Sequence, residues 1–174
     1  MKRIITILLC IALLLCGCSQ KESFENPCSF YYLSGEADEE DAAKVFAVKN
    51  VEAEGLSNQE LIGLYLAGTD DQKMRSPFPN GTYLVELILA EDCVSVVLTD
   101  SFASLTGIDL TLACVCLGRT CMDMMQVQRI EIRCKTHKLN GSDSVILDRS
   151  SFCLQDTFQP DPSDPTSPYL TEGN

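Results

Sequence analysis

The sequence predicts an α+β domain, in which a small, mostly antiparallel sheet carries two helices packed on one face. Short runs rich in β-branched and aromatic residues alternate along the chain with two segments of helical periodicity. Two of the apolar runs, 82–90 and 94–99, are separated by a tight turn and predict a hairpin. The chain that follows an N-terminal leader is long enough for one domain with its own core.

The leader has the pattern of an export signal. Lys2 and Arg3 precede an apolar run over 4–15, which is shorter than the ~20 residues that a membrane-spanning helix needs. The stretch LCGC (15–18) resembles a bacterial lipobox, with Gly17 directly before Cys18 and Leu15 three positions before it. We therefore expect residues 1–17 to be a lipoprotein signal peptide. A plain cleaved signal peptide is the alternative.

Lipidation of Cys18 would place the protein on the extracytoplasmic face of the cell membrane. Several acyl chains on one residue give stable anchoring, because each buried CH₂ contributes ~0.8 kcal/mol. Residues 18–28 are polar and predict a tether, 29–158 the folded domain, and 159–174 (QPDPSDPTSPYLTEGN) a disordered, proline-rich tail. The net charge of −12 becomes two units more negative without Lys2 and Arg3, which excludes nucleic acid as a partner.

The first half of the domain predicts two strands and a helix. The runs 29–33 and 44–51 are the strands. The stretch SNQE (57–60) predicts a capping box, in which the side chains of Ser57 and Glu60 each bond the other residue's backbone N–H. The helix that follows is expected to end at Gly68. The segment MRSPFPNGT (74–82) then predicts a loop.

The second half predicts the hairpin, a longer helix and two further strands. The run 82–90 is almost continuously apolar and is expected to be buried on both faces, with its hairpin partner at 94–99. The segments 127–133 and 144–147 are the later strands. A helix is expected over 108–124, opened by Thr106 and Asp109. Its apolar stripe comprises Leu110, Ala113, Cys114, Leu117, Cys121 and Met124.

Cysteines offer the first test for chemistry, because seven of the ten follow Cys18. An exported chain favours disulfides, and Cys28 with Cys153 would join the two ends of the domain. Free thiols acting as small apolar residues are the alternative. A metal or redox site at Cys114, Cys116 and Cys121 is disfavoured, because Cys114 and Cys116 lie about 200° apart on a helix and the spacing is not that of a zinc knuckle.

Other candidate groups also lack a chemical pattern. His137 stands outside any arrangement with a nucleophile and predicts an exposed loop residue. The acidic group at 36–41 lacks the glycine and the final glutamate of a calcium loop, and predicts a solvated loop. We therefore expect no catalytic residues, no bound metal and no cofactor, and hence a protein that is not an enzyme.

Several stretches resemble the GerMN (Germane) domain family. These are LIGLYLAGT (61–69), SPFPNGT (76–82), VSVVLTDSF (94–102), Thr120 and VQRIEI (127–132). The resemblance covers about 30–152 and implies a bacterial envelope lipoprotein linked to sporulation or spore germination. It also implies an interaction or ligand-binding module with no catalytic residues, and Phe102 as a plug in the core.

The predicted function is therefore a lipid-anchored interaction module. Its membrane partner is the lipid attached through Cys18, and its other partner is an envelope protein or the cell wall. The contact surface is expected either at an exposed sheet edge or at a loop that holds its shape while staying exposed. The residues of that loop are Arg75, Ser76, Pro77, Phe78, Pro79 and Asn80. The alternative function is a thiol- or metal-dependent redox protein that uses Cys114, Cys116 and Cys121.

Overall fold

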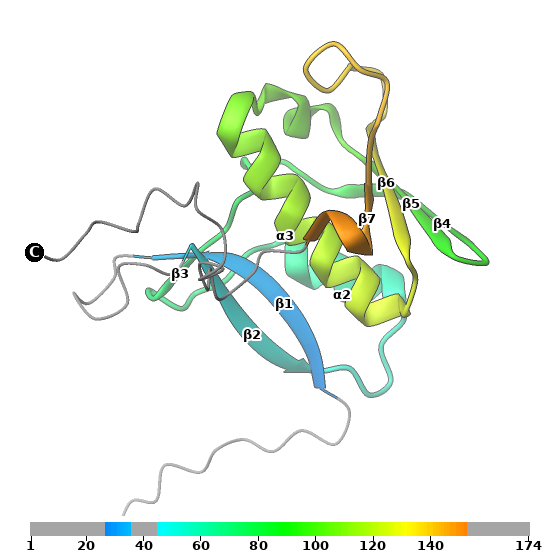
Figure 1. The fold of residues 1–174 in the computed structure, drawn as a ribbon. Coiled ribbons are helices and arrows are strands. Elements are labelled where there is room, and N and C mark those ends of the chain that lie inside the picture. Colours follow the sequence, from blue (N-terminus) through cyan, green and yellow to red (C-terminus); the bar gives the residue numbers. More distant parts are fainter. Residues whose placement is uncertain (1–26, 36–44, 153–174) are drawn as a thin grey trace, which may run out of the picture.

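The computed structural model describes residues 27–35 and 45–152, and these residues form an α+β fold, as the sequence predicts (Figure 1). The N-terminal elements are β1 (Pro27–Ser34), β2 (Phe46–Glu52), α2 (Asn58–Leu66), β3 (Met74–Arg75) and β4 (Leu84–Ala90). The C-terminal elements are β5 (Cys93–Leu98), the 3₁₀ turn η1 (Asp100–Ser104), α3 (Gly107–Met125), β6 (Arg129–Cys134), β7 (Val145–Asp148) and the 3₁₀ turn η2 (Arg149–Phe152).

Several expectations lie outside the described residues. They are the signal peptide, Cys18, most of the tether, the acidic group at 36–41, Cys153 and the proline-rich tail. At the N-terminal border, β1 begins at Pro27, so Pro27 and Cys28 belong to the domain rather than to the tether. Cys28 is buried in the core.

The strands divide between two sheets, where the sequence predicts one. The first sheet has the order β2-β1-β3 and the second has the order β4-β5-β6-β7. All strand pairs are antiparallel except β5 with β6. That pair is parallel because the chain between the two strands crosses over through η1 and α3. Helix α3 contacts β1, and β3 pairs with β1 only at Leu33 and Ser34.

Helix α3 lies between the two sheets (Figure 1). The predicted stripe along one face of α3 is buried, apart from the half-buried Met124, and residues on other faces are buried as well. The further buried residues of α3 are Cys116, Gly118, Thr120 and Met122. A helix on the surface of a single sheet would bury only one stripe. The wider buried surface therefore follows from packing on both sides.

The main chain of Tyr31 in β1 joins the first sheet to both helices. Its N–H donates to Thr120 Oγ1 of α3 at 3.0 Å, and its carbonyl accepts from Tyr65 Oη of α2 at 2.5 Å. Both partner side chains are fully buried. Burying the edge of a strand without such partners would leave polar groups unpaired at a cost of about 1–3 kcal/mol each. These two bonds therefore allow the edge of β1 to pack against helices.

Aromatic rings continue this junction into the core. Tyr65 contacts Phe30, Tyr32 and Phe78, with ring centroids 5.0, 5.2 and 5.1 Å apart. Phe78 in turn contacts Phe102 at 6.3 Å, and the expected burial of Phe102 in the core is confirmed.

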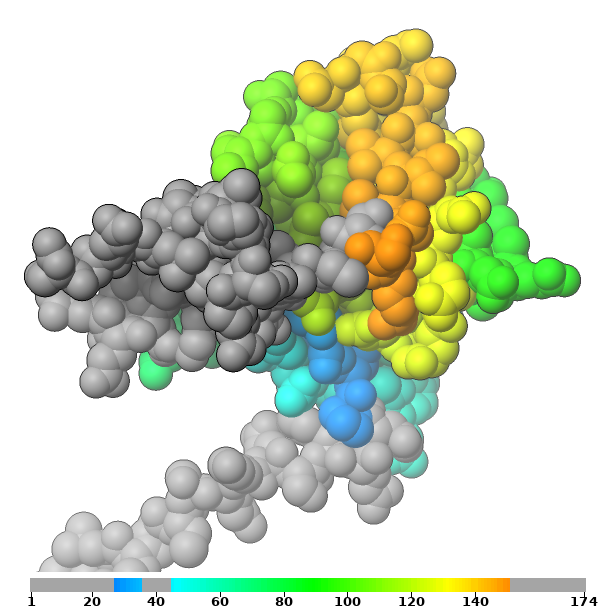
Figure 2. All heavy atoms as spheres, in the orientation of Figure 1, coloured from blue at the N-terminus to red at the C-terminus, as the bar shows by residue number. Residues whose placement is uncertain are grey.

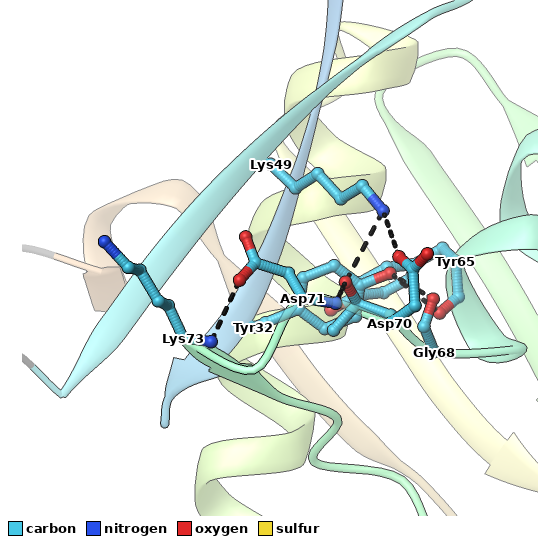
Figure 3. A network of polar contacts seen from close by, with 8 residues as sticks. Tyr32, Lys49, Tyr65, Gly68, Asp70, Asp71 and Lys73 are labelled. Carbon is cyan, nitrogen blue, oxygen red and sulfur yellow. Dashed lines mark hydrogen bonds and ion pairs between the residues drawn. The ribbon is translucent and has the colours of Figure 1, made fainter. Parts of the chain in front are cut away.

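The single O–H of Tyr32 is shared between the carbonyls of Gly68 at 3.1 Å and Tyr65 at 3.3 Å, so it joins the end of α2 to β1 (Figure 3). Gly68 has φ +94°, which is the left-handed conformation expected where a helix ends at glycine. The predicted C-terminal end of this helix is therefore confirmed.

The predicted N-terminal capping bonds are present in α2 but not in α3. The capping box of α2 is present, since Glu60 N–H donates to Ser57 Oγ at 3.3 Å and Ser57 N–H donates to Glu60 Oε2 at 2.8 Å. Thr106 is the N-cap residue of α3, but its side chain makes no capping bond. The segment predicted as a loop from residue 74 begins with the short strand β3, because Met74 and Arg75 pair with the end of β1.

The prediction that 82–90 is buried on both faces is wrong. Strand β4 pairs with β5 and lies at the edge of its sheet, and its side chains are exposed or half-buried. A continuous apolar run cannot by itself distinguish a central strand from an apolar edge strand. The neighbouring strand β5 is one of the two central strands, and its Val94, Val96 and Leu98 are fully buried.

We expect Thr120→Val to lower the free energy of unfolding by about 1–3 kcal/mol, because the buried Tyr31 N–H would lose its acceptor. Urea unfolding followed by circular dichroism measures this change. Thr111→Val is the matched control, since Thr111 lies on the exposed face of the same helix. Equal effects of the two substitutions would contradict a special role for Thr120.

Candidate interaction surface

Strand β4 and the residue before it expose large apolar side chains along one edge of the second sheet. The exposed fractions are 65% for Tyr83, 44% for Val85, 45% for Ile88 and 56% for Leu89. Figure 2 shows the β4–β5 hairpin, in green, protruding from the body of the molecule. Within the described part of the chain, β4 pairs with β5 alone. Its outer backbone groups are therefore available for pairing with another strand.

A cleft of about 350 Å³ lies between α2 and the first half of β4. Gln59, Gly63 and Leu66 line it from α2, at spacings that place them on one helical face. Residues 83–86 line the opposite wall. A bulge between Leu84 and Glu86 shifts the register of β4 at this point. The cleft therefore opens directly beside the sheet edge.

The sequence did not identify this cleft as a site. Two signals pointed to an exposed position, namely Glu86 within the apolar run and Gly63 within the helix. Neither signal is specific, because a charged residue in a strand or a glycine in a helix also occurs where no cleft is present. Contact between α2 and β4, which are distant in sequence, is what creates the cleft.

The predicted loop at 75–80 contains both buried and exposed residues. Pro77 and Phe78 are buried, and Phe78 packs between Tyr65 and Phe102. Arg75 and Asn80 are exposed, whereas Ser76 and Pro79 are half-buried. Gly81, next to this loop, has φ +85° and allows the turn that precedes β4. Arg75 and Asn80 are the loop residues most open to solvent, and an interaction through this loop stays a prediction.

A further cleft, of about 500 Å³, lies between β2 and the end of α2 and is lined by Phe30, Tyr32 and Leu64 among others. At its rim, Lys49 Nζ lies 3.4 Å from Asp70 Oδ1 and 3.4 Å from Thr69 Oγ1 (Figure 3). Asp71 Oδ1 accepts from the N–H of Lys73 and closes the following turn. These contacts hold the turn at 69–73 against β2, and they engage the polar side chains at the rim of the cleft.

Five of the six described cysteines are buried and act as small apolar residues, whereas Cys93 is half-buried. All six cysteines in the described ranges are free thiols, so Cys28 makes no disulfide there. Burial raises the pKa of Cys114 and Cys116 to about 12, and it also raises the pKa of Cys121. These groups are thiols at neutral pH, whereas redox chemistry and metal binding need thiolates. The alternative function as a thiol-dependent redox protein is therefore not supported.

His137 belongs to an exposed turn held by Asp100. The Asp100 carboxylate accepts from Thr136 N–H at 2.8 Å, Thr136 Oγ1 at 2.6 Å and His137 N–H at 3.0 Å. These donors, with Thr136 foremost, hold the pKa of Asp100 well below its usual range. His137 Nδ1 lies 3.2 Å from the same carboxylate and is exposed to solvent. The contacts of Asp100 with Thr136 and His137 therefore stabilise the turn that follows β6.

The described residues show no cluster of three or more His, Cys, Asp or Glu side chains that could hold a metal ion. None of the helices in the described ranges is long and apolar enough to span a membrane.

No protein-family model matches the chain, and no curated protein matches it by sequence. The fold is similar to the 2.5 Å crystal structure of a candidate lipoprotein from Clostridium perfringens, with 14% identity and a TM-score of 0.43. The match covers 72% of this chain and 89% of the other.

We expect thiol alkylation at about pH 8 to distinguish Cys93 from the buried cysteines. Cys93 is half-buried and should react first, whereas Cys116 and Cys121 should react only after denaturation, because they are fully buried. Mass spectrometry of peptides from the full chain measures each site. Rapid native labelling of Cys116 would contradict the packing of α3.

We expect Asp100→Asn to destabilise the fold at neutral pH and to have a smaller effect in acid. Asp100 has a lowered pKa in the folded protein, so its contribution is complete above its usual value near 3.8 and is lost as the pH falls. Thermal unfolding of the original protein and the variant between about pH 3 and 7 tests whether the effect shrinks as the pH falls. Asp143→Asn is the control, since Asp143 is mostly exposed. If the loss of stability caused by Asp100→Asn were the same at every pH, this account would be contradicted.

Proposed function

We propose that this protein is a lipid-anchored interaction module on the extracytoplasmic face of the cell membrane. The lipobox-like stretch that ends at Cys18 supports the anchor. The resemblance to the GerMN family supports a role in sporulation, germination or another process of the cell envelope. The partner is an envelope protein or the cell wall, and the high negative charge argues against nucleic acid.

The apolar edge of β4 is the observation that favours binding over catalysis. Soluble proteins usually protect sheet edges with charged residues, prolines or short strands. Here four residues in succession, Leu87 to Ala90, carry no charge and lie at the edge. Such a surface is retained when a partner covers it. Asp100 and His137, which lie together on the surface, hold the turn after β6.

This function predicts specific cross-linking from the edge of β4 in living cells. A photoreactive benzoylphenylalanine in place of Leu89 should form an adduct with an envelope protein, because Leu89 is exposed at the edge. Mass spectrometry identifies the adduct. The additional change Cys18→Ser should release the protein from the membrane fraction and reduce the yield, since the anchor keeps both proteins on one surface.

Benzoylphenylalanine in place of Ile108 is the matched control, since Ile108 is 74% exposed at the start of α3, outside β4. The same adducts from both positions, or none from Leu89, would contradict an interaction through β4. Unchanged membrane association of the Cys18→Ser variant would contradict the anchor.

A further inference from the structure

We propose that the cleft between α2 and β4 binds an extended, apolar and basic segment of the partner protein, which joins the second sheet as an additional strand beside β4. This inference rests on the proposed function and defines the chemistry of its partner. It requires an available strand edge, room for side chains and a charge that selects the segment.

The strand edge is provided by β4. A two-residue turn at Glu91 and Asp92 joins β4 to β5, and Ala90 pairs with Cys93. In an antiparallel pair, alternate residues direct both N–H and C=O away from the partner strand. Since β4 is an edge strand, these outward groups can bond an incoming main chain at the usual spacing of ~4.8 Å.

Room for side chains is provided by α2. Gly63 faces the cleft, and a Cβ built at this position would contact nothing within 4 Å. Side chains of an added strand alternate between the two faces of the sheet. Those on the α2 side would enter the cleft of about 350 Å³, which has the volume for one or two large apolar side chains. The arrangement of an edge strand beside a helix is one that proteins use to bind extended peptides.

Charge favours a basic segment over a second copy of this chain. Glu86 on β4 is exposed, and Glu91 and Asp92 are exposed at the hairpin turn. With a net charge of −12, a second copy would add like charges along the same edge. A lysine or arginine in the bound segment, placed near Glu86, would instead form a favourable cross-strand pair.

Other sheet edges in the described ranges are less suitable. Strand β2 carries Lys49 and Asn50, and Lys49 is already engaged with Asp70. Strand β7 has only four residues. Strand β3 has only two residues. Strand β2 also has seven residues and a cleft beside it, but Lys49 lines that cleft and would repel a basic segment, whereas the cleft beside β4 is lined by Glu86.

The test measures binding of a fluorescent seven-residue peptide, in which valine or leucine alternates with lysine, to the purified protein by fluorescence anisotropy. We expect saturable binding. N-methylation of the peptide's alternate backbone nitrogens keeps its charge but removes N–H donors, and should weaken binding at least about tenfold. Replacing the lysines of the peptide with glutamates should abolish binding. Equal binding of the N-methylated peptide would overturn the inference, because attraction to the acidic surface would then account for the signal.

Variants of the protein locate the site. Gly63→Ala leaves the cleft open and should bind like the original protein, whereas Gly63→Phe should fill the cleft and weaken binding at least about tenfold. Ile88→Lys is a second variant that places a repelling charge at an exposed position and should also weaken binding. Thermal unfolding verifies that each variant is folded. Equal affinity of Gly63→Phe and Gly63→Ala, or no effect of Ile88→Lys, would overturn the proposed location.

Cross-linking in cells separates this inference from the proposed function. Suppose that an adduct forms from Leu89, but that neither N-methylation of the peptide nor Gly63→Phe changes the peptide's affinity. This result would support the interaction module and overturn strand addition. Peptide binding with the expected sensitivities, but without an adduct in cells, would support the cleft as a peptide site and contradict the proposed cellular role.

Discussion

The fold depends on how the buried edge of β1 satisfies its hydrogen bonds. A strand edge without a neighbouring strand is normally exposed to water, because its N–H and C=O groups need partners. At Tyr31 the partners are the side chains of Thr120 and Tyr65, at 3.0 and 2.5 Å. The first sheet can therefore pack against two helices, and the domain contains two sheets with a helix between them.

Small residues make up much of the buried surface of α3. Besides the larger Leu110, Leu117 and Met122, the helix buries alanine, glycine, threonine and several cysteines. Cysteine is a small apolar residue when it is protonated, and burial raises the pKa of these thiols. The buried cysteines of α3 thus act as small apolar residues of the core.

The side chain of Tyr31 extends the junction on the surface. Its hydroxyl donates to Asp123 at 2.8 Å, and the guanidinium of Arg119 lies 4.8 Å from the centre of its ring. Arg149, at the start of η2, also bonds Asp123 and reaches the carbonyl of Met122. These contacts fix the last described segment to the end of α3, so both ends of the described domain meet at one helix.

Local patterns in the sequence determined the α+β class, most strand positions, the capping box at Ser57 and the helix end at Gly68, because each depends on residues close together along the chain. The stripe on α3 was predicted only in part, since burial of Cys116 and Thr120 depends on a second sheet. The tertiary structure alone placed β4 at an edge, buried Phe78 of the predicted loop and brought Gly63 beside β4. An apolar run in the sequence indicates only that its side chains are favoured in a place away from water. Whether the domain itself or a partner covers them depends on contacts between distant segments, which no local pattern contains.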